Sequence, residues 1–122
     1  EQCTVAALAS HLGSATAGVM TFLVRPMAGG QPPVAITPEQ IDAGNAQNAR
    51  DHAHRPKAEA LAELRANGAA ASAEIRGLSE AQLDSSTLLF FSPEPVTVEG
   101  VIENALINHL RGHLGSLRAA VA

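Results

Sequence analysis

The sequence predicts an all-α fold, an antiparallel bundle of helices, on the basis of three observations. Alanine, which favours helix and lets helices pack closely, accounts for 24 of the 122 residues. The aromatic residues that help to build sheets are sparse, with three phenylalanines, no tryptophan and no tyrosine. Apolar residues also recur at helical spacing between capping signatures. A chain of 122 residues has room for one domain, so we assign residues 1–122 to a single unit.

Two helices separated by a loop are expected in the first part of the chain. Thr4 is a suitable N-cap for a helix whose apolar residues recur until Pro26, where we expect the helix to end. Residues 28–36 are rich in glycine and proline, which predicts a loop. The capping-box sequence Thr37-Pro38-Glu39-Gln40 then begins a second helix, which should run towards Arg50.

The middle of the chain is expected to form a long, interrupted helical arm. Pro56 predicts a second helix start, a kink or a short break, and residues 57–76 continue with helical spacing to Gly77. Ser79-Glu80-Ala81-Gln82 is another capping-box sequence, which opens a short helix ending near Asp84.

One apolar run and one long helix complete the chain. Residues 88–91 are apolar, but Pro93 and Pro95 follow at once, which favours a buried loop over a strand. Thr97 caps the last helix, whose apolar face is expected to continue to the end of the chain.

Charge, hydropathy and cysteine content restrict the partners and the compartment. The formal net charge is −4 and the eight basic residues form no cluster, so we expect no nucleic-acid binding. No stretch reaches about 18 uninterrupted apolar residues, and the N-terminus lacks a signal-peptide pattern, so we expect no membrane span. The single cysteine, Cys3, fits a reducing cytoplasm, and we expect it to be a small apolar filler rather than a catalytic thiol. A cytoplasmic protein with a small-molecule substrate is the expectation.

Three of the five histidines fall on the apolar sides of predicted helices. His109 and His113 are four residues apart, so their side chains point within about 40° of each other, one helical turn apart. His11 lies on the apolar side of the first helix. If a bundle brings these faces together, three imidazoles meet, and such a set with an open position binds zinc, nickel or iron. The alternative is that each ring is a hydrogen-bonded core residue, or that the pair faces water.

The other two histidines are expected to take no part in metal binding. His52 and His54 are two residues apart, so on a helix they point about 160° away from each other. Asp51, Arg55 and Pro56 around them indicate a solvated helix end.

Segments near both ends of the chain carry a resemblance to a known family. Residues 4–12 resemble a capped helix that carries a first histidine, and residues 96–99 with 108–114 resemble a closing helix with a His-x-x-x-His pair. Residues 77–84 are similar to the connecting segment before that helix. On these segments the chain resembles the DinB-like (YfiT-like) family of metal-binding four-helix bundles. That family includes thiol-dependent S-transferases and is related to the metal-binding domain of mycothiol-dependent maleylpyruvate isomerase.

The resemblance implies a single DinB-like domain over residues 1–122 in which His11, His109 and His113 coordinate a divalent metal ion. It also implies a bundle that is often a homodimer. The family usually places a whole helix before the one that carries its first histidine, whereas only three residues precede Thr4 here. We therefore expect the first helix of the bundle to be missing from this chain or supplied by a neighbour, and the chain to self-associate.

Two classes of function follow as hypotheses. The first is a metal-dependent enzyme, such as a transferase that joins a low-molecular-weight thiol, bound as thiolate, to an electrophile; metal-dependent hydrolysis is its close alternative. The second is a non-catalytic bundle that binds a small molecule or a partner, with structural histidines. A shared fold does not fix the reaction.

Overall fold

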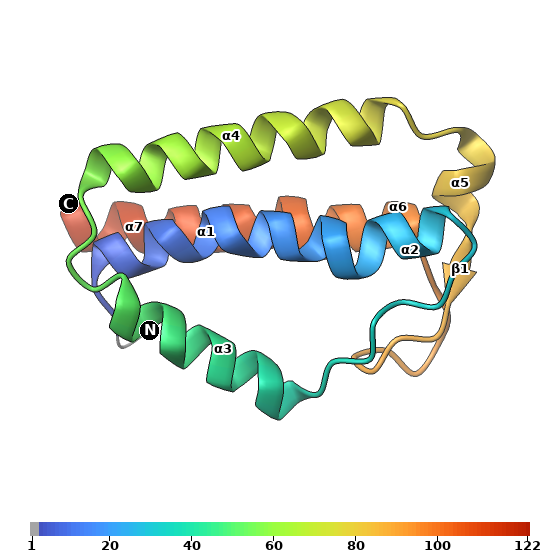
Figure 1. Ribbon diagram of the computed structural model, residues 1–122, viewed down its shortest axis with the longest axis horizontal. Helices are drawn as coiled ribbons and strands as arrows, with labels where there is room; N and C mark the ends of the chain where they lie inside the picture. Colours follow the sequence, from blue (N-terminus) through green and yellow to red (C-terminus); the bar gives the residue numbers. More distant parts are fainter. Residues whose placement is uncertain (1–2) are drawn as a thin grey trace.

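The computed structural model describes residues 3–122, and the chain is 72% helical (Figure 1). In chain order the elements are α1 (Val5–Val19), the π-helical segment η1 (Met20–Val24), α2 (Arg25–Ala28), α3 (Pro38–Asp51), α4 (Lys57–Arg76), α5 (Glu80–Asp84), β1 (Ser86–Thr87), β2 (Val96–Thr97), α6 (Val98–Val101), the π-helical segment η2 (Ile102–Asn108) and α7 (His109–Val121). The expectation of a helical fold is confirmed, with the two-residue strands β1 and β2 as its small exception.

Three long helical units lie side by side, and α3 diverges from them (Figure 1). α1, η1 and α2 form one continuous helix, and α6, η2 and α7 form another. When α3 is counted, the helices alternate in direction along the chain, so that α4 runs the same way as α1, against which it packs, and the last helix runs the opposite way. α3 contacts α1 near its own C-terminal end, where Asn48 donates a hydrogen bond to the carbonyl of Ala7 (3.0 Å). None of the residues Pro38–Asp51 is buried, so α3 forms an open side of the molecule.

Side-chain caps begin four helices at the residues that the sequence predicts. In each case the side-chain oxygen accepts a hydrogen bond from the backbone N–H three residues later; the caps are Thr4, Thr37, Ser79 and Thr97. Complete capping boxes form at Thr37 and Ser79, where a glutamine side chain accepts in return from the cap's own N–H. Local hydrogen bonding therefore fixes where these helices start.

Pro26 does not end the first helix, which corrects the expectation from the sequence. Proline has no N–H, so the carbonyl of Phe22, four residues earlier, loses its helical donor. The backbone N–H of Val34 donates to that carbonyl instead (3.2 Å), and the turn before Pro26 is π-helical. The helix therefore continues to Ala28, and the loop after it is tied to the helix surface.

The arm expected over residues 38–76 consists of two helices with a chain reversal between them (Figure 1). Arg55, in the reversal, forms an ion pair with Glu63 of α4. Its guanidinium also donates to the buried hydroxyl of Ser10 in α1 (3.3 Å). These contacts hold the reversal against both helices, so Pro56 marks the start of a separate helix rather than a kink.

Close approach of α1 and α4 depends on a glycine. A Cβ atom at Gly13 would lie 3.3 Å from the backbone nitrogen of Leu64 and 3.3 Å from Cγ of Glu63. Asn67 of α4 donates a hydrogen bond to the carbonyl of Gly13 (2.9 Å). The missing side chain allows the two backbones to meet.

The hydrophobic core lies towards the end of the molecule where η1 and α2 meet α6 and η2. Its buried members are Met20, Val24, Met27, Ala71, Leu89, Val98, Val101, Ile102 and Leu106. Aliphatic and methionine side chains build it, and none of the phenylalanines in the described chain belongs to it. The core fixes the first half of the last helix, while none of the residues His109–Val121 is buried. The apolar face of the last helix is thus fully buried only in its first half; Leu110 and Leu117 are partly buried, and Leu114 is 41% exposed.

Residues 88–91 form a loop, as predicted, but most of that loop is not buried. Antiparallel pairing of Ser86 with Thr97 and of Thr87 with Val96 closes a hairpin whose loop contains residues 88–91. Only Leu89 turns into the core, whereas Leu88, Phe90 and Phe91 are exposed. The expectation of a buried loop is therefore wrong for all but Leu89, because the short ladder directs the rest of the loop away from the core.

One helix, Val5–Ala28, is long and apolar enough to cross a membrane, judged by length and composition alone (24 residues, mean hydropathy 1.4). Core helices and signal sequences meet the same criteria, and 44% of its apolar window is buried within the molecule.

Candidate metal centre

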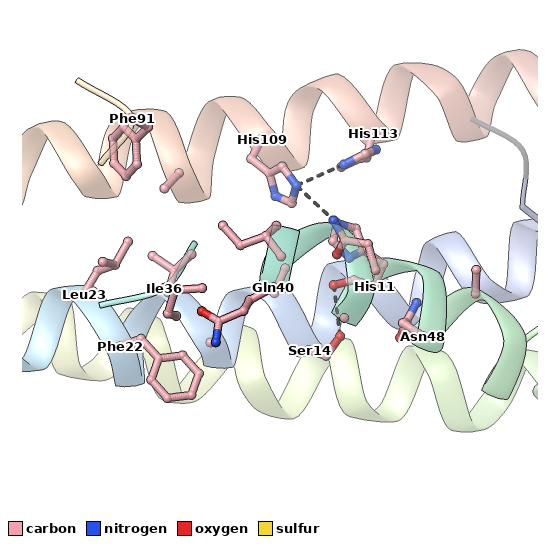
Figure 2. A pocket seen from close by; sticks show the side chains of 18 of the residues that line it. His11, Ser14, Phe22, Leu23, Ile36, Gln40, Asn48, Phe91, His109 and His113 are labelled. Carbon is pink, nitrogen blue, oxygen red and sulfur yellow. Dashed lines mark hydrogen bonds between the residues drawn. The ribbon is translucent and has the colours of Figure 1, made fainter. Parts of the chain in front are cut away.

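A cavity of about 860 Å³ opens between α1, η1, α3, the loop at residues 90–91 and the last helix (Figure 2). Three histidines lie at one end of it. Phe22, Leu23 and Phe91 lie towards the other end. Cys3 also lines the cavity and is exposed, so the expectation that it fills an interior gap is wrong. The divergence of α3 creates this space, because a helix packed closely along α1 would fill it.

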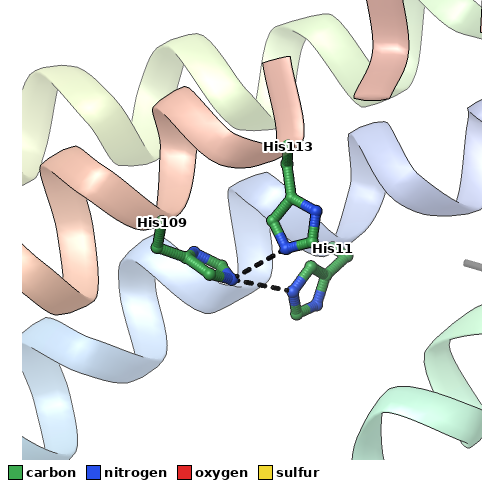
Figure 3. A group of neighbouring side chains, drawn as sticks. All are labelled: His11, His109 and His113. Carbon is green, nitrogen blue, oxygen red and sulfur yellow. Dashed lines mark hydrogen bonds between the residues drawn. The ribbon is translucent and has the colours of Figure 1, made fainter. Parts of the chain in front are cut away.

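The structure brings together the three histidines that the sequence places on apolar helix faces (Figure 3). His11 comes from α1, and His109 and His113 come from α7. The Nε2 atom of His109 lies 3.3 Å from Nε2 of His11 and 3.0 Å from Nε2 of His113. One potential ligand atom from each ring lies within 4.8 Å of the other two, and all three residues are partly buried. We call this group the histidine triad.

Local helix geometry explains why the rings converge. The π-helical segment η2 ends at Asn108, so His109 and His113 both lie in regular α-helix and share one face. On α1, His11 lies between the buried residues Ser10 and Leu12, on a turn that faces the last helix. π-Helical segments frequently occur at functional sites, and here one immediately precedes the histidine pair.

The three rings are arranged edge to face around a common point. The ring centroid of His11 is 5.2 Å from the ring centroid of His109 and 5.2 Å from that of His113, and those of His109 and His113 are 4.5 Å apart. The interplanar angles are 79°, 85° and 90°. Rings in this arrangement direct their nitrogens towards the space between them (Figure 3).

The spacing of the nitrogens fits a small divalent cation. A tetrahedral zinc ion with Zn–N bonds of about 2.0–2.1 Å places its ligand atoms about 3.3 Å apart. The Nε2 atom of His109 lies 3.3 and 3.0 Å from those of His11 and His113, close to that value. A hydrogen bond between two imidazole nitrogens requires one to carry a proton and the other a lone pair, whereas a cation accepts a lone pair from all of them. The donor set of imidazoles alone suits zinc, nickel or iron better than magnesium or calcium.

His52 and His54 lie apart from the triad. Nδ1 of His52 is within hydrogen-bonding distance of the side-chain oxygen (3.0 Å) and the carbonyl (3.2 Å) of Asn48, so its ring is held at the end of α3. His54 is exposed in the reversal before α4. Across residues 3–122, the triad is the one group of three or more histidine, cysteine or acidic side chains with the spacing of metal ligands.

Sequence reasoning missed the cavity next to the triad. Its walls depend on the angle at which α3 diverges from the other helices, and α3 has no buried residue that would mark this angle in the sequence. The exposed phenylalanines were a possible signal, because they are the chain's only aromatic residues apart from histidine. Comparisons with protein-family models, with curated proteins and with solved structures found no match to this chain.

Proposed function

We propose that this chain is a DinB-like, divalent-metal-binding helical bundle that acts as a metal-dependent enzyme, such as a low-molecular-weight-thiol S-transferase. In this proposal His11, His109 and His113 hold the ion. The observation that carries it is the convergence of three ring nitrogens, from two helices, at one end of an open cavity. The resemblance of residues 4–12 and 108–114 to the DinB-like family supports the same proposal.

A divalent metal in the triad would supply a Lewis acid that lowers the pKa of a thiol bound to it, so that thiolate exists near neutral pH. The histidines hold and orient the ion through their ring nitrogens, and they do not attack the substrate. Beside the triad, the cavity leaves room for a second reactant. Holding two reactants next to each other is a large part of what such a site contributes.

Side chains that transfer protons are scarce around the triad. The chain has no tyrosine, and its one lysine, Lys57, begins α4 and does not line the cavity. The hydroxyl of Ser14 does line the cavity, but it donates to the carbonyls of Ser10 (3.1 Å) and His11 (3.3 Å) within its own helix. The proposal therefore favours a reaction whose main requirement is an activated nucleophile. Metal-dependent hydrolysis shares that requirement and is the alternative reaction.

A second candidate function, non-catalytic binding of a small molecule, is favoured by the exposure of the cavity wall. Phe22, Phe90 and Phe91 are 41%, 52% and 50% exposed. Catalytic sites of this kind usually exclude water, and large exposed apolar patches more often mark binding surfaces.

Metal analysis of the purified full chain tests the metal centre. Mass-spectrometric metal quantification after dialysis at neutral pH should find one zinc, nickel or iron ion per chain. If the protein takes up none of these ions when they are supplied, both the metal centre and the enzyme proposal that rests on it are wrong.

A further inference from the structure

All three phenylalanines of this chain line the cavity that contains the triad. Burial in a core is where a phenylalanine stabilises a protein most, and this core contains none. Instead, Phe22 and Phe91 come from opposite sides of the cavity, from η1 and from the loop after β1 (Figure 2). Val34 and Ile41 join them as large, exposed apolar side chains in the same wall. The largest apolar side chains are thus placed where a ligand can reach them.

The cavity wall carries no aspartate, glutamate, lysine or arginine among residues 3–122. Its ionisable groups are the histidine triad, at one end, and Cys3. A charged group on a ligand would therefore lose part of its water in the phenylalanine-lined part without gaining an ionic partner, which is unfavourable. The wall selects against charge along most of its length.

Four of the uncharged polar side chains in the wall already make hydrogen bonds within the protein, whereas Asn45 makes none among the described residues. Asn48 donates to the backbone of α1 (3.0 Å), and Asn104 donates to the backbone of its own helix (3.0 Å). The side-chain oxygen of Gln40 accepts from the N–H of its helix cap (2.9 Å), and Ser14 donates within α1 (3.1 Å). An apolar ligand can lie against these groups without breaking their hydrogen bonds.

We infer that the cavity binds an uncharged, largely apolar small molecule, with its body between Phe22 and Phe91 and a heteroatom end at the histidine triad. The volume of about 860 Å³ lies within the range of small-molecule sites, which is about 300–1,000 Å³. The triad is the polar end of the cavity, and the phenylalanines are the apolar end, so the ligand has one orientation (Figure 2). The position of the ligand's heteroatom end rests on the proposed metal centre, whereas the inference that its body is uncharged does not.

The test uses the neutral dye N-phenyl-1-naphthylamine, whose fluorescence rises in apolar surroundings, with the full chain in zinc-loaded and metal-free forms. Two competitors of equal chain length, octane-1-thiol and 8-mercaptooctanoate, differ in whether a carboxylate occupies the end away from the thiol. We expect the dye to bind both forms of the protein. We expect the carboxylate to weaken displacement from the zinc-loaded form by about tenfold, because it would lose part of its hydration against the phenylalanines without gaining an ionic partner.

Matched variants locate the site. Phe22→Ala combined with Phe91→Ala should weaken dye binding by about tenfold or more, since both rings contact the bound body. Leu88→Ala, at a more exposed position in the loop of Phe91 that does not line the cavity, should leave binding unchanged. Circular dichroism should show that each variant retains its helices.

Three results would overturn the inference: no dye binding to the wild-type protein, equal displacement by the two thiols, or equal loss of affinity in the Leu88→Ala control. Loss of dye binding in a monomeric Leu114→Asp variant, whose substitution lies outside the cavity wall, would overturn it too, because binding would then require an interface between copies. Zinc content is measured on the same samples. Dye binding without zinc uptake would contradict the metal centre but support a site for an uncharged ligand. Zinc uptake without dye binding would support the metal centre but contradict that ligand site.

Discussion

The Nε2 atoms of His11 and His109 lie 3.3 Å apart although 98 residues separate them in the chain. That contact joins the two ends of the fold, because α1 is its first long helix and α7 its last. A shared ion would therefore act as a crosslink between them, in addition to any role in chemistry.

Removing one triad histidine should abolish metal binding. His113→Ala leaves two imidazoles, and we expect metal content to fall from one ion per chain to a small fraction of that value. The double variant His52→Ala with His54→Ala should keep full occupancy, because neither ring is near the triad. Metal quantification and calorimetric titration with zinc measure both. Full occupancy in His113→Ala would show that the triad is not the ligand set.

Thiol conjugation tests the enzyme proposal directly. Metal-loaded protein should accelerate the reaction of mycothiol, bacillithiol or glutathione with a simple aromatic electrophile, followed by absorbance. The metal-free protein and His113→Ala serve as controls, because each lacks the ion that would lower the pKa of the thiol. If none of the three thiols reacts faster than in these controls, the transferase proposal gives way to hydrolysis or to binding.

Self-association is expected through the exposed face of the last helix. Ile107, Leu114 and Val121 are 42%, 41% and 71% exposed and are spaced seven residues apart, so they form one stripe along that helix. None of the three lines the cavity. Leu114→Asp should convert a dimer at micromolar concentration into a monomer, as measured by sedimentation velocity. A wild-type chain that sediments as a monomer would contradict this prediction.

Two glycines should respond in opposite ways to a side chain. Gly13→Leu should destabilise the fold by about 1–3 kcal/mol, because its Cβ atom already meets the backbone of Leu64 at 3.3 Å. Gly68→Ala, in an open position on α4, should stabilise the fold by about 0.5–1 kcal/mol, because alanine restricts the unfolded chain. Urea denaturation of both variants measures the free energies of unfolding. Equal effects would mean that α1 and α4 do not approach as described.

The ion pair between Arg25 and Glu74 should give a small, pH-dependent contribution to stability. The hydrogen bond from Arg25 (Nε to Oε2, 2.7 Å) holds the pKa of Glu74 below its usual value of 4.5. A lowered pKa in the folded state stabilises the fold at pH values above 4.5, and this contribution is lost as the pH falls through the folded-state pKa. Glu74→Gln should therefore be slightly less stable than the wild type near neutral pH and equally stable in strong acid. Urea denaturation of both proteins near neutral pH and in strong acid measures this. A difference in the free energy of unfolding that persists in acid would assign the effect to packing.

Local signals in the sequence predict where the helices start. The features that they do not predict depend on contacts between segments far apart in the chain. Thr37 and Ser79 could be recognised as caps because the residues that complete each capping box lie within one turn. The continuation past Pro26 depends on a donor from Val34, and the exposure of Leu88, Phe90 and Phe91 depends on the pairing of β1 with β2. Neither partner can be identified from local spacing.

The meeting of the triad was accessible from the sequence for a different reason. His109 and His113 share a helix face by spacing alone, and His11 falls on the apolar side of its own helix, which a helical fold turns inward. The cavity beside them was not accessible, because it depends on the direction of α3, which contributes no buried residue and so carries no strong apolar pattern.

One wall of the cavity depends on an irregularity in the first helix, because Val34 donates a hydrogen bond to the carbonyl of Phe22, which Pro26 cannot satisfy. Because Pro26 has no N–H, the carbonyl of Phe22 is left to accept from Val34, and this hydrogen bond holds Val34 and Ile36 of the loop at the cavity. A substitution that repaired the helix, such as Pro26→Ala, would supply a competing donor for the same carbonyl. A helix with regular hydrogen bonding at this position would thus anchor the loop of Val34 less firmly, so the proline favours the cavity wall at the expense of helix geometry.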